Sequence, residues 1–295
     1  MTKILSGKEL SRKMREEFKS EIEELKSRYN LVPGLAVILI GDDPASMSYV
    51  KGKEKACAEV GILSREYKFD PDYKEEELLN LIGELNNDRT IHGILVQLPL
   101  PEHINEEKVI YSISPEKDVD GFHPINIGKM MIGAPSFLPC TPHGIQLLLV
   151  RNGIEIQGKH VVIVGRSNIV GKPLAMILIQ KNPQANATVT ICHSRTENLS
   201  TITKTADILV AAVGRPHTIT ADMVKSGAVV IDVGVNRVED STKKRGYRLV
   251  GDVDFEEVSK KVSAISPVPG GVGPMTITML LYNTIQSAKA HADIK

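Results

Sequence analysis

The sequence contains no tryptophan and few other aromatic residues, with five Phe and seven Tyr in 295 positions. It also lacks an excess of charge, because 36 Lys and Arg residues balance 36 Asp and Glu residues. A neutral chain generates no overall field toward nucleic acid or an anionic membrane, so neither is expected as a partner. No apolar run reaches the length that a membrane-spanning helix needs.

Cysteine is scarce as well: Cys57, Cys140 and Cys192 are far apart and odd in number. This pattern argues against a disulfide framework and fits a reducing compartment, with each thiol a small buried side chain. Neither the cysteines nor the eight histidines show metal-binding spacing, so no metal is expected. The N-terminal segment lacks the apolar block of a signal peptide. We therefore expect a cytoplasmic protein of two domains.

The first half of the chain alternates helical and strand patterns. Apolar residues recur at three- and four-residue steps over 10–29, which predicts an amphipathic helix. Two short apolar runs, LAVILIG (35–41) and GILVQL (93–98), are typical of strands buried on both faces. Helices are expected over 46–60 and 75–86. These patterns predict an N-terminal α/β domain.

The alternation becomes more regular beyond residue 140. Four short apolar or β-branched runs are separated, in the earlier cases, by helix-length segments: HVVIVG (160–165), ATVTIC (187–192), DILVAAVG (207–214) and AVVIDVG (228–234). Such alternation predicts a doubly wound parallel sheet of the nucleotide-binding type. A charged surface hairpin or loop is expected over 236–250, and a final helix over 273–291.

The loop GRSNIVGKP (165–173) lies between a predicted strand and a predicted helix, where free backbone N–H groups and the helix dipole attract phosphate. Gly165 matches the first glycine of G-x-G-x-x-G, but Ser167 and Val170 occupy the other two positions and Gly171 comes one residue late. An ordinary tight turn would explain this loop equally well if it stood alone.

The end of the following strand bears on the choice of cofactor. NAD-binding domains usually place an acid there for the ribose 2′-hydroxyl, but CHSRT (192–196) contains none. Arg166, Ser194 and Arg195 can instead converge on a 2′-phosphate, which favours NADP unless the arginines are simply solvated. Two further glycine turns, at 213–216 and 233–236, also follow strands, where open α/β sheets bind their ligands.

The stretch SMSYVKGK (46–53) contains a Tyr-x-x-x-Lys pair. On a helix, Tyr49 and Lys53 share one stripe with Ala56, Cys57 and Val60, so we expect Lys53 to face inward. An inward lysine is rare unless paired and can serve as a general base, although its long chain can also reach solvent. The pair precedes the nucleotide loop by more than a hundred residues. Short-chain dehydrogenases have the opposite order, so that interpretation fails.

Two other polar residues are marked by their context. Gln97 is the only polar side chain in GILVQLPLP (93–101), and a buried amide needs partners, so it can fix the ammonium of Lys53. Asp120 lies in EKDVDGFHP (116–124), where capping of the local turn would explain both it and Asp118.

Seven blocks, in this order, resemble the bifunctional methylenetetrahydrofolate dehydrogenase/methenyltetrahydrofolate cyclohydrolase family of the FolD type. The blocks are SYVKGKEKACAEVGI (48–62), GILVQLPLP (93–101), KDVDGFHP (117–124), PCTPHG (139–144), VVIVGRSNIVGKP (161–173), GAVVIDVGVNR (227–237) and SPVPGGVGPMT (266–276). The resemblance covers nearly the whole chain.

This resemblance implies a catalytic folate-binding domain over 1–139 and a Rossmann-like NADP-binding domain over 140–272, with the helix 273–295 packing back on the first domain. A folate cleft would lie between the domains, and a homodimer would form through the nucleotide domains. The family oxidises 5,10-methylenetetrahydrofolate with NADP⁺ and hydrolyses the methenyl product to 10-formyltetrahydrofolate. These are steps of one-carbon metabolism.

Residue by residue, Lys53 matches the catalytic lysine and Gln97 the partner that tunes it. Tyr49 matches the tyrosine that orients the folate ring, Asp120 the carboxylate that holds the pterin, and Ser46 a nearby polar position. The loop that closes over the substrate matches Pro269, Gly270, Gly271 and Val272. The predicted NADP contacts are Gly165, Arg166, Ser167, Ser194, Arg195 and Val235.

Two other functions stay open at this point. One is a different two-domain NADP-dependent dehydrogenase, of the shikimate or amino-acid type, which would be indifferent to folates. The other is a nucleotide-sensing protein without catalytic activity, against which an inward-facing Lys53 with its partners argues.

Overall fold

The structure, a computed structural model that describes residues 2–243 and 246–294, divides into two compact units. Unit one comprises residues 1–11 and 141–276, and unit two comprises 12–140 and 277–295. Positions 1 and 295, at the ends of the predicted domains, and positions 244 and 245, in the predicted hairpin, lie outside the described residues. No helix of the described residues is long and apolar enough to cross a membrane.

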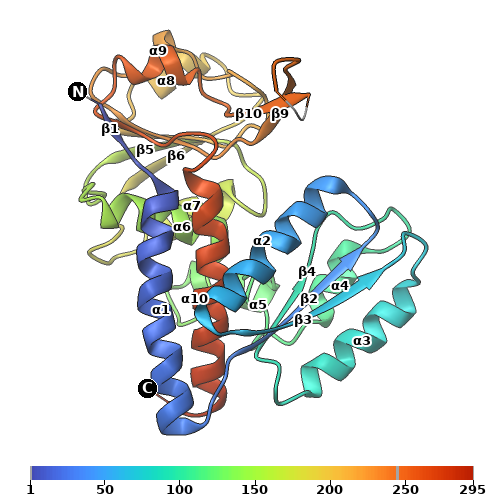
Figure 1. Ribbon diagram of the computed structural model, residues 1–295. Coiled ribbons are helices and arrows are strands. Elements are labelled where there is room, and N and C mark those ends of the chain that lie inside the picture. The colour runs from blue at the N-terminus through green and yellow to red at the C-terminus, as the bar shows by residue number, and fades with distance from the viewer. Residues whose placement is uncertain (1, 244–245, 295) are drawn as a thin grey trace. The chain divides into compact units, whose positions relative to one another are not determined.

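Unit two is built around a three-stranded parallel sheet with the order β3-β2-β4 (Figure 1). Its elements, some of which begin or end in unit one, are α1 (Gly7–Tyr29), β2 (Gly34–Ile40), α2 (Pro44–Val60), β3 (Leu63–Phe69), α3 (Glu75–Asn87), β4 (Gly93–Val96), α4 (Glu106–Ser112), α5 (Pro124–Met131) and α10 (Val272–His291). All residues of β2 and β4 are buried, as the continuous apolar runs predict.

The two faces of this sheet are covered by different helices. Ala36, Ile38 and Ile40 alternate along β2 and share one apolar core with residues of α3 and α4. Because successive side chains of a strand point to opposite faces, Leu35 and Leu39 face the other side. Figure 1 shows α2 and α3 on opposite sides of the sheet. The helix α2 begins shortly after the carboxyl end of β2 and leads back to the start of the parallel strand β3, so its first turns lie close to the carboxyl ends of the strands.

The C-terminal helix completes unit two. From Ile277 onward α10 belongs to this unit, and its polar residues bind backbone carbonyls there. Asn283 Nδ2 donates to the carbonyls of Val119 and Leu138 at 2.8 and 3.0 Å. Ser287 Oγ donates to the carbonyl of His92 at 2.5 Å. The predicted return of this helix to the N-terminal α/β unit is confirmed.

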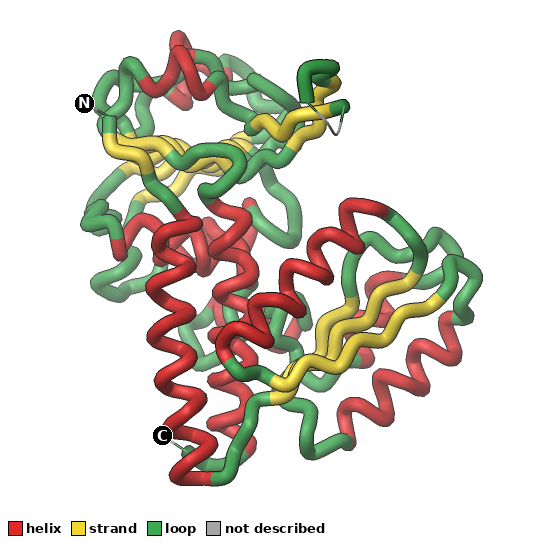
Figure 2. The backbone as a smooth tube through the Cα atoms, viewed as in Figure 1, coloured by secondary structure: helices red, strands yellow, loops and turns green. Residues whose placement is uncertain are grey.

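Unit one contains a six-stranded parallel sheet with the order β1-β11-β8-β7-β5-β6, drawn as yellow strands in Figure 2. Its elements are β1 (Lys3–Ile4), α6 (Cys140–Arg151), β5 (His160–Val164), α7 (Gly171–Leu178), β6 (Thr188–Cys192), α8 (Leu199–Thr203), β7 (Ile208–Ala211), the 3-10 turn η1 (Ala221–Met223), β8 (Val229–Asp232), β9 (Asn236–Glu239), β10 (Tyr247–Val250), α9 (Phe255–Ser259) and β11 (Ala264–Ile265).

The strand order of unit one reverses beside β5, which has β6 on one side and β7 on the other. In a doubly wound sheet, this reversal opens a crevice at the carboxyl ends of the strands, where ligands bind. The predicted Rossmann-like sheet is thereby confirmed. The strands β9 and β10 pair as an antiparallel hairpin within the predicted segment 236–250, outside the main sheet.

A buried histidine links β4 to the core of unit two. His92 is 5% exposed, and its Nδ1 accepts the backbone N–H of Gly34 at 3.0 Å, which requires an unprotonated nitrogen. Burial, together with the nearby positive charges of His291 and Lys117, lowers the pKa of His92 to about 4. The folded protein therefore holds this imidazole in its neutral form at neutral pH.

We expect His92 to make the protein less stable in acid. Between pH 6.5 and about 4, His92 is protonated in the unfolded chain but neutral in the folded protein. The free energy of unfolding is therefore highest above pH 6.5 and decreases as the pH falls through this range. The loss amounts to about 3 kcal/mol at most, since each pKa unit is worth about 1.4 kcal/mol. Replacement His92→Asn keeps an acceptor near Nδ1 but cannot titrate. Urea unfolding at pH 7 and 4.5 should show a shallower pH dependence in this variant, and equal slopes would contradict the assignment.

Candidate functional site

The helix α2 carries the predicted Tyr-Lys pair. Asp43 caps it by accepting the backbone N–H of Ser46 at 2.7 Å, and Pro44 occupies the first turn. Its buried residues follow steps of four and three: Ser46, Val50, Lys53, Ala56, Cys57 and Val60. Lys53 is 8% exposed and faces inward, whereas Lys51 and Lys55 are exposed.

Tyr49 departs from its predicted position. Its side chain is 40% exposed and does not share the buried stripe, because Val50 takes the corresponding inward place. The buried face is centred on Ser46, Val50 and Lys53, so a residue one position before Val50 lies about 100° around the helix, at the margin of that face. The tyrosine ring is consequently available to a ligand beside Lys53 and contributes less to the core than predicted.

Lys53 and Gln97 are brought together by a hydrogen bond. Lys53 Nζ donates to Gln97 Oε1 at 3.0 Å, and Gln97 Nε2 donates to the carbonyl of Leu98 at 2.6 Å. Gln97 directly follows β4, and its backbone N–H donates to the carbonyl of Ile38 in β2. Both ends of the amide are engaged, so its oxygen stays directed at the ammonium.

Asp118 and Asp120 have different environments, although capping of the local turn was a possible explanation for both. Asp118 accepts the backbone N–H groups of Gly121, Phe122 and His123 at 3.2, 3.2 and 2.8 Å, so it caps the turn. It also accepts Asn126 Nδ2 at 2.9 Å. The side chain of Asp120 takes no part in this capping. Its neighbour Asp118 pairs with Ile94 of β4, which brings Asp120 to the sheet edge where Gln97 lies.

The carboxyl of Asp120 interacts with two groups that the chain supplies from elsewhere. Burial raises its pKa, and the charge of Asp118 raises it further. The ammonium of Lys53 and a hydrogen bond from the Cys140 thiol lower it, without reversing the direction. Burial and the charge of Asp120 also raise the pKa of Cys140 well above its usual value, so the thiol keeps its proton and can donate it.

Sequence reasoning missed two residues around Asp120. Cys140 was expected only as a small buried residue; it is buried, and its Sγ lies 3.3 Å from the carbonyl of Val119, which competes with Asp120 for the single thiol proton. Asn283 binds the carbonyl of Val119, directly before Asp120, and the carbonyl of Leu138 in a separate segment. A signal for Asn283 was present, since an asparagine within the apolar run MLLYNTI must find partners when buried.

The predicted nucleotide loop lies in unit one, at the carboxyl edge beside the reversal of strand order. Gly165 has φ of +137°, and a side chain there would overlap the carbonyl of Ala212. A side chain on Gly171, the first residue of α7, would overlap the carbonyl of Gly165. Both glycines let the backbone turn tightly into the helix and keep the N-terminus of α7 open to an anion.

The predicted 2′-phosphate ligands lie at this same edge. Val164 of β5 pairs with Cys192 of β6, so the residues that follow each strand leave the sheet side by side. Arg166, Ser194 and Arg195 are exposed there, as is Ser167, whose Oγ accepts the backbone N–H of Val170 at 3.1 Å. The donors and positive charges suit a phosphorylated ribose, so the residues present fit NADP.

The remaining predicted contacts also belong to unit one. Val235 is 47% exposed and follows β8. In the loop 269–272, Gly270 has φ of +101° and its carbonyl accepts the N–H of Lys8 at 2.9 Å. A side chain on Gly271 would overlap the carbonyl of Pro267. The backbone alone therefore requires both glycines, and Val272 starts α10.

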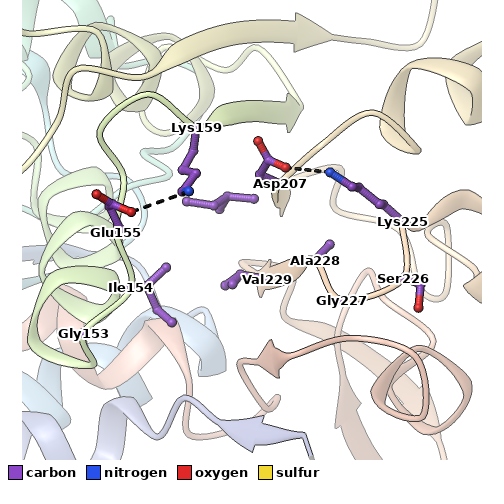
Figure 3. Close-up of a pocket in the computed structure, with 11 residues that line it drawn as sticks. Gly153, Ile154, Glu155, Lys159, Asp207, Lys225, Ser226, Gly227, Ala228 and Val229 are labelled. Carbon is purple, nitrogen blue, oxygen red and sulfur yellow. Dashed lines mark hydrogen bonds and ion pairs between the residues drawn. The ribbon is translucent and has the colours of Figure 1, made fainter.

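A separate cavity of about 370 Å³ lies at the opposite, amino edge of the same sheet (Figure 3). The starts of β7 and β8 line it, and its charges are paired: Lys225 with Asp207 at 2.7 Å and Lys159 with Glu155 at 3.5 Å. None of the predicted site residues lines it. Nor do the described residues contain a cluster of three or more His, Cys, Asp or Glu that could hold a metal ion.

Comparison with known protein families shows which family the chain belongs to. Residues 5–120 match the family described as tetrahydrofolate dehydrogenase/cyclohydrolase, catalytic domain, and residues 139–292 match its NAD(P)-binding domain. The chain belongs to the tetrahydrofolate dehydrogenase/cyclohydrolase family. The resemblance predicted from the seven sequence blocks is confirmed.

Individual relatives are similar to this chain along nearly its full length. The chain is 58% identical over 293 residues to the bifunctional protein FolD of Acetivibrio thermocellus, covering 99% of each. It is 52% identical to the bifunctional FolD enzyme of Campylobacter jejuni, whose crystal structure gives a TM-score of 0.92 and covers 98% of this chain and 99% of that one.

A third relative, the FolD protein of Trypanosoma brucei complexed with NADP cofactor and inhibitor, is 38% identical with a TM-score of 0.93, covering 99% of this chain and 98% of that one. The shikimate dehydrogenase of Thermus thermophilus, in contrast, is 15% identical with a TM-score of 0.52, covering 88% of this chain and 99% of that one. That likeness shows a shared fold alone, so it does not support the shikimate alternative.

Proposed function

We propose that this protein is a bifunctional enzyme that oxidises 5,10-methylenetetrahydrofolate with NADP⁺ and hydrolyses the resulting methenyl compound to 10-formyltetrahydrofolate. Membership of the family and full-length identity of 58% to a bifunctional FolD protein support both activities. The two activities also fit each other chemically. Loss of hydride leaves a cationic, amidinium-like carbon, which is electrophilic enough for one positioned base to direct water onto it.

The observation that carries the proposal is the hydrogen bond between Lys53 Nζ and Gln97 Oε1 at 3.0 Å. Lys53 reaches this position from the inward face of α2, where water is largely excluded. With Gln97 anchored on β4, the amine is held at one place and can exchange a proton with the attacking water. We assign Lys53 as the catalytic base, which takes the proton of the attacking water as a neutral amine and thereby becomes the ammonium, and Gln97 as the group that orients it.

We assign substrate binding to Tyr49, Asp120 and the loop 269–272. The exposed ring of Tyr49, one turn before Lys53, can form a wall for the folate ring. The carboxylate of Asp120 can accept two hydrogen bonds from the amino-amide edge of a pterin. Asp120 is only partly exposed, so water competes less for its carboxylate oxygens than at the open surface, which strengthens such bonds. The loop 269–272 would close over the substrate, and Ser46 lies near by on α2.

NADP⁺ supplies the hydride acceptor when bound. The chain's contribution is the open N-terminus of α7 beside Gly165 and Ser167, which suits the pyrophosphate. The exposed cations Arg166 and Arg195, with Ser194, would bind the 2′-phosphate. Val235 would contact an apolar part of the cofactor.

We further propose that the enzyme acts as a homodimer joined through its nucleotide-binding unit, in the cytoplasm. The three cysteines are unpaired and buried, as suits a reducing compartment. Its partner is a tetrahydrofolate derivative, and its balanced charge gives no reason to expect nucleic acid or a membrane.

The first test of the proposal combines an assay with removal of the base. The protein is mixed with methylenetetrahydrofolate and NADP⁺, and the absorbances of reduced cofactor and of methenyl-folate are followed separately. Lys53→Ala should lower the rate of methenyl-folate hydrolysis by roughly 10²- to 10⁴-fold, the usual contribution of a positioned base. Lys51→Ala, an exposed lysine on the same helix, serves as the control.

Two outcomes would contradict this assignment. No turnover by the unaltered protein with either nicotinamide cofactor would reject the function itself. Hydrolysis at the normal rate by Lys53→Ala would reject only the role of that lysine.

The second test concerns Asp120. Asp120→Asn keeps the size of the side chain but removes the charge that a pterin's amino-amide edge would pair with. We expect the KM for folate to rise roughly ten- to hundredfold, since a hydrogen bond to a charged group is worth about 1.5–3 kcal/mol. The KM for NADP⁺ should stay unchanged. Glu116→Gln, on the same segment but exposed, should leave both constants unchanged; an equal effect of both variants would speak against a direct contact.

A further inference from the structure

Unit one buries two carboxylates that the proposed mechanism does not use. Asp232 ends β8 and is 2% exposed, and Asp252, which follows β10, is 0% exposed. A carboxylate removed from water is costly unless hydrogen-bond donors replace the water. The donors that surround this pair show which parts of the chain it holds.

Asp252 binds the loop that follows β7. Its carboxylate accepts three consecutive backbone N–H groups, from Val213 at 2.5 Å, Gly214 at 2.9 Å and Arg215 at 3.0 Å. It also accepts Asn236 Nδ2 at 2.9 Å, from the start of β9. Successive N–H groups that converge in this way form a concave anion site, and here the anion is part of the protein.

Asp232 in turn holds Asp252. Its carboxylate accepts the backbone N–H of Asp252 at 2.9 Å, of Val253 at 3.0 Å and of Gly234 at 3.0 Å. Burial raises the pKa of Asp232 to about 6, although these three donors pull it down. The two acids therefore form one connected set of bonds that joins the loop after β7, the loop after β8 and the segment after β10.

Two glycines leave room for this pair. A side chain on Gly234 would overlap the carboxylate of Asp252, and a side chain on Gly251 would overlap that of Asp232. The contact is tight, so neither loop can shift without breaking bonds to a buried charge. Such a loss is expensive, because the carboxylate cannot regain water in place of the lost donor.

We propose that Asp252, held in place by Asp232, is a positioning residue for the dinucleotide. It fixes the loops 213–215 and 234–236 at the carboxyl edge of β7 and β8, beside the reversal of strand order where the cofactor is expected. The inference rests on the NADP binding proposed above. Asp252 itself would not touch the cofactor.

The same geometry implies that different loops bind different parts of the cofactor. The three N–H groups that follow β7 are occupied by Asp252, and a negative charge lies beneath them. Such a loop disfavours phosphate, which is left to the loop 165–171 and the N-terminus of α7. The loops after β7 and β8, with the exposed apolar Val235 between Gly234 and Asn236, contact an uncharged part of the dinucleotide.

The test is a titration of NADP⁺ onto the full-length variant Asp252→Asn, whose amide can accept fewer of these bonds. The Kd for NADP⁺ should rise roughly tenfold, as the loss of a charge-assisted hydrogen bond predicts. Hydrolysis of methenyl-folate, which consumes no hydride acceptor, should stay within about twofold because Lys53 and Gln97 lie in the other unit. Asn236→Ala, which removes one partly buried donor, should weaken NADP⁺ binding in the same direction if Asp252→Asn does not fold.

Two controls separate positioning from stability. Asp222→Asn removes an exposed acid of the same unit and should not change the Kd. Val258→Ala removes buried methyl groups from the same core and lowers stability while keeping every hydrogen bond of Asp252, so it should also leave the Kd unchanged.

An unchanged Kd in Asp252→Asn and in Asn236→Ala would overturn the positioning role alone, and so would an equal rise in Val258→Ala. No binding of NADP⁺ by the unaltered protein would overturn both this role and the proposed cofactor.

Discussion

The account of this protein depends on one buried hydrogen bond, from Lys53 Nζ to Gln97 Oε1. An ammonium that is only 8% exposed must find an acceptor, and the parallel sheet of unit two provides one where β4 ends. The parallel topology brings the other site residues to the same place, because the carboxyl ends of parallel strands meet at one edge of the sheet. There α2 contributes Lys53, β4 contributes Gln97, and the segment paired with Ile94 contributes Asp120.

Three buried acids of the two units share one role, and the partly exposed Asp120 differs from them. Asp118, Asp232 and Asp252 each accept several backbone N–H groups, so their charges stabilise turns and loops. Asp120 instead accepts a thiol and lies within the field of Lys53. Because Asp120 accepts no backbone N–H group of the described residues in this way, its carboxylate can still accept hydrogen bonds from a ligand. The carboxylates of the other three acids are already occupied by backbone N–H groups that stabilise the fold. This distinction separates the acid proposed to touch substrate from the acids proposed to position the chain.

The sequence predicted the elements with strong local patterns and missed those that depend on distant partners. The apolar runs of β2, β4, β5 and β8 predict buried strands, whereas β3, LSREYKF, is a half-exposed edge strand in which charges hide the pattern. Lys53 was identified because helical periodicity fixes its direction. The exposure of Tyr49 depends on the rotation of α2 about its own axis. The spacing of apolar residues predicts that rotation only approximately, so a residue at the margin of the buried face cannot be assigned from it. The contact of Cys140 with Asp120, and the loops gathered by Asp252, arise from long-range packing that no local pattern records.

A double-mutant cycle on methenyl-folate hydrolysis tests the central claim most directly. The rates of Lys53→Ala, Gln97→Ala and the double variant are compared with that of the unaltered protein. If Gln97 acts by orienting Lys53, its removal should slow the intact enzyme but change little once Lys53 is gone, with a coupling energy of about 1–3 kcal/mol. Additive losses, with Gln97→Ala slowing the Lys53→Ala enzyme as much as the unaltered one, would contradict the account.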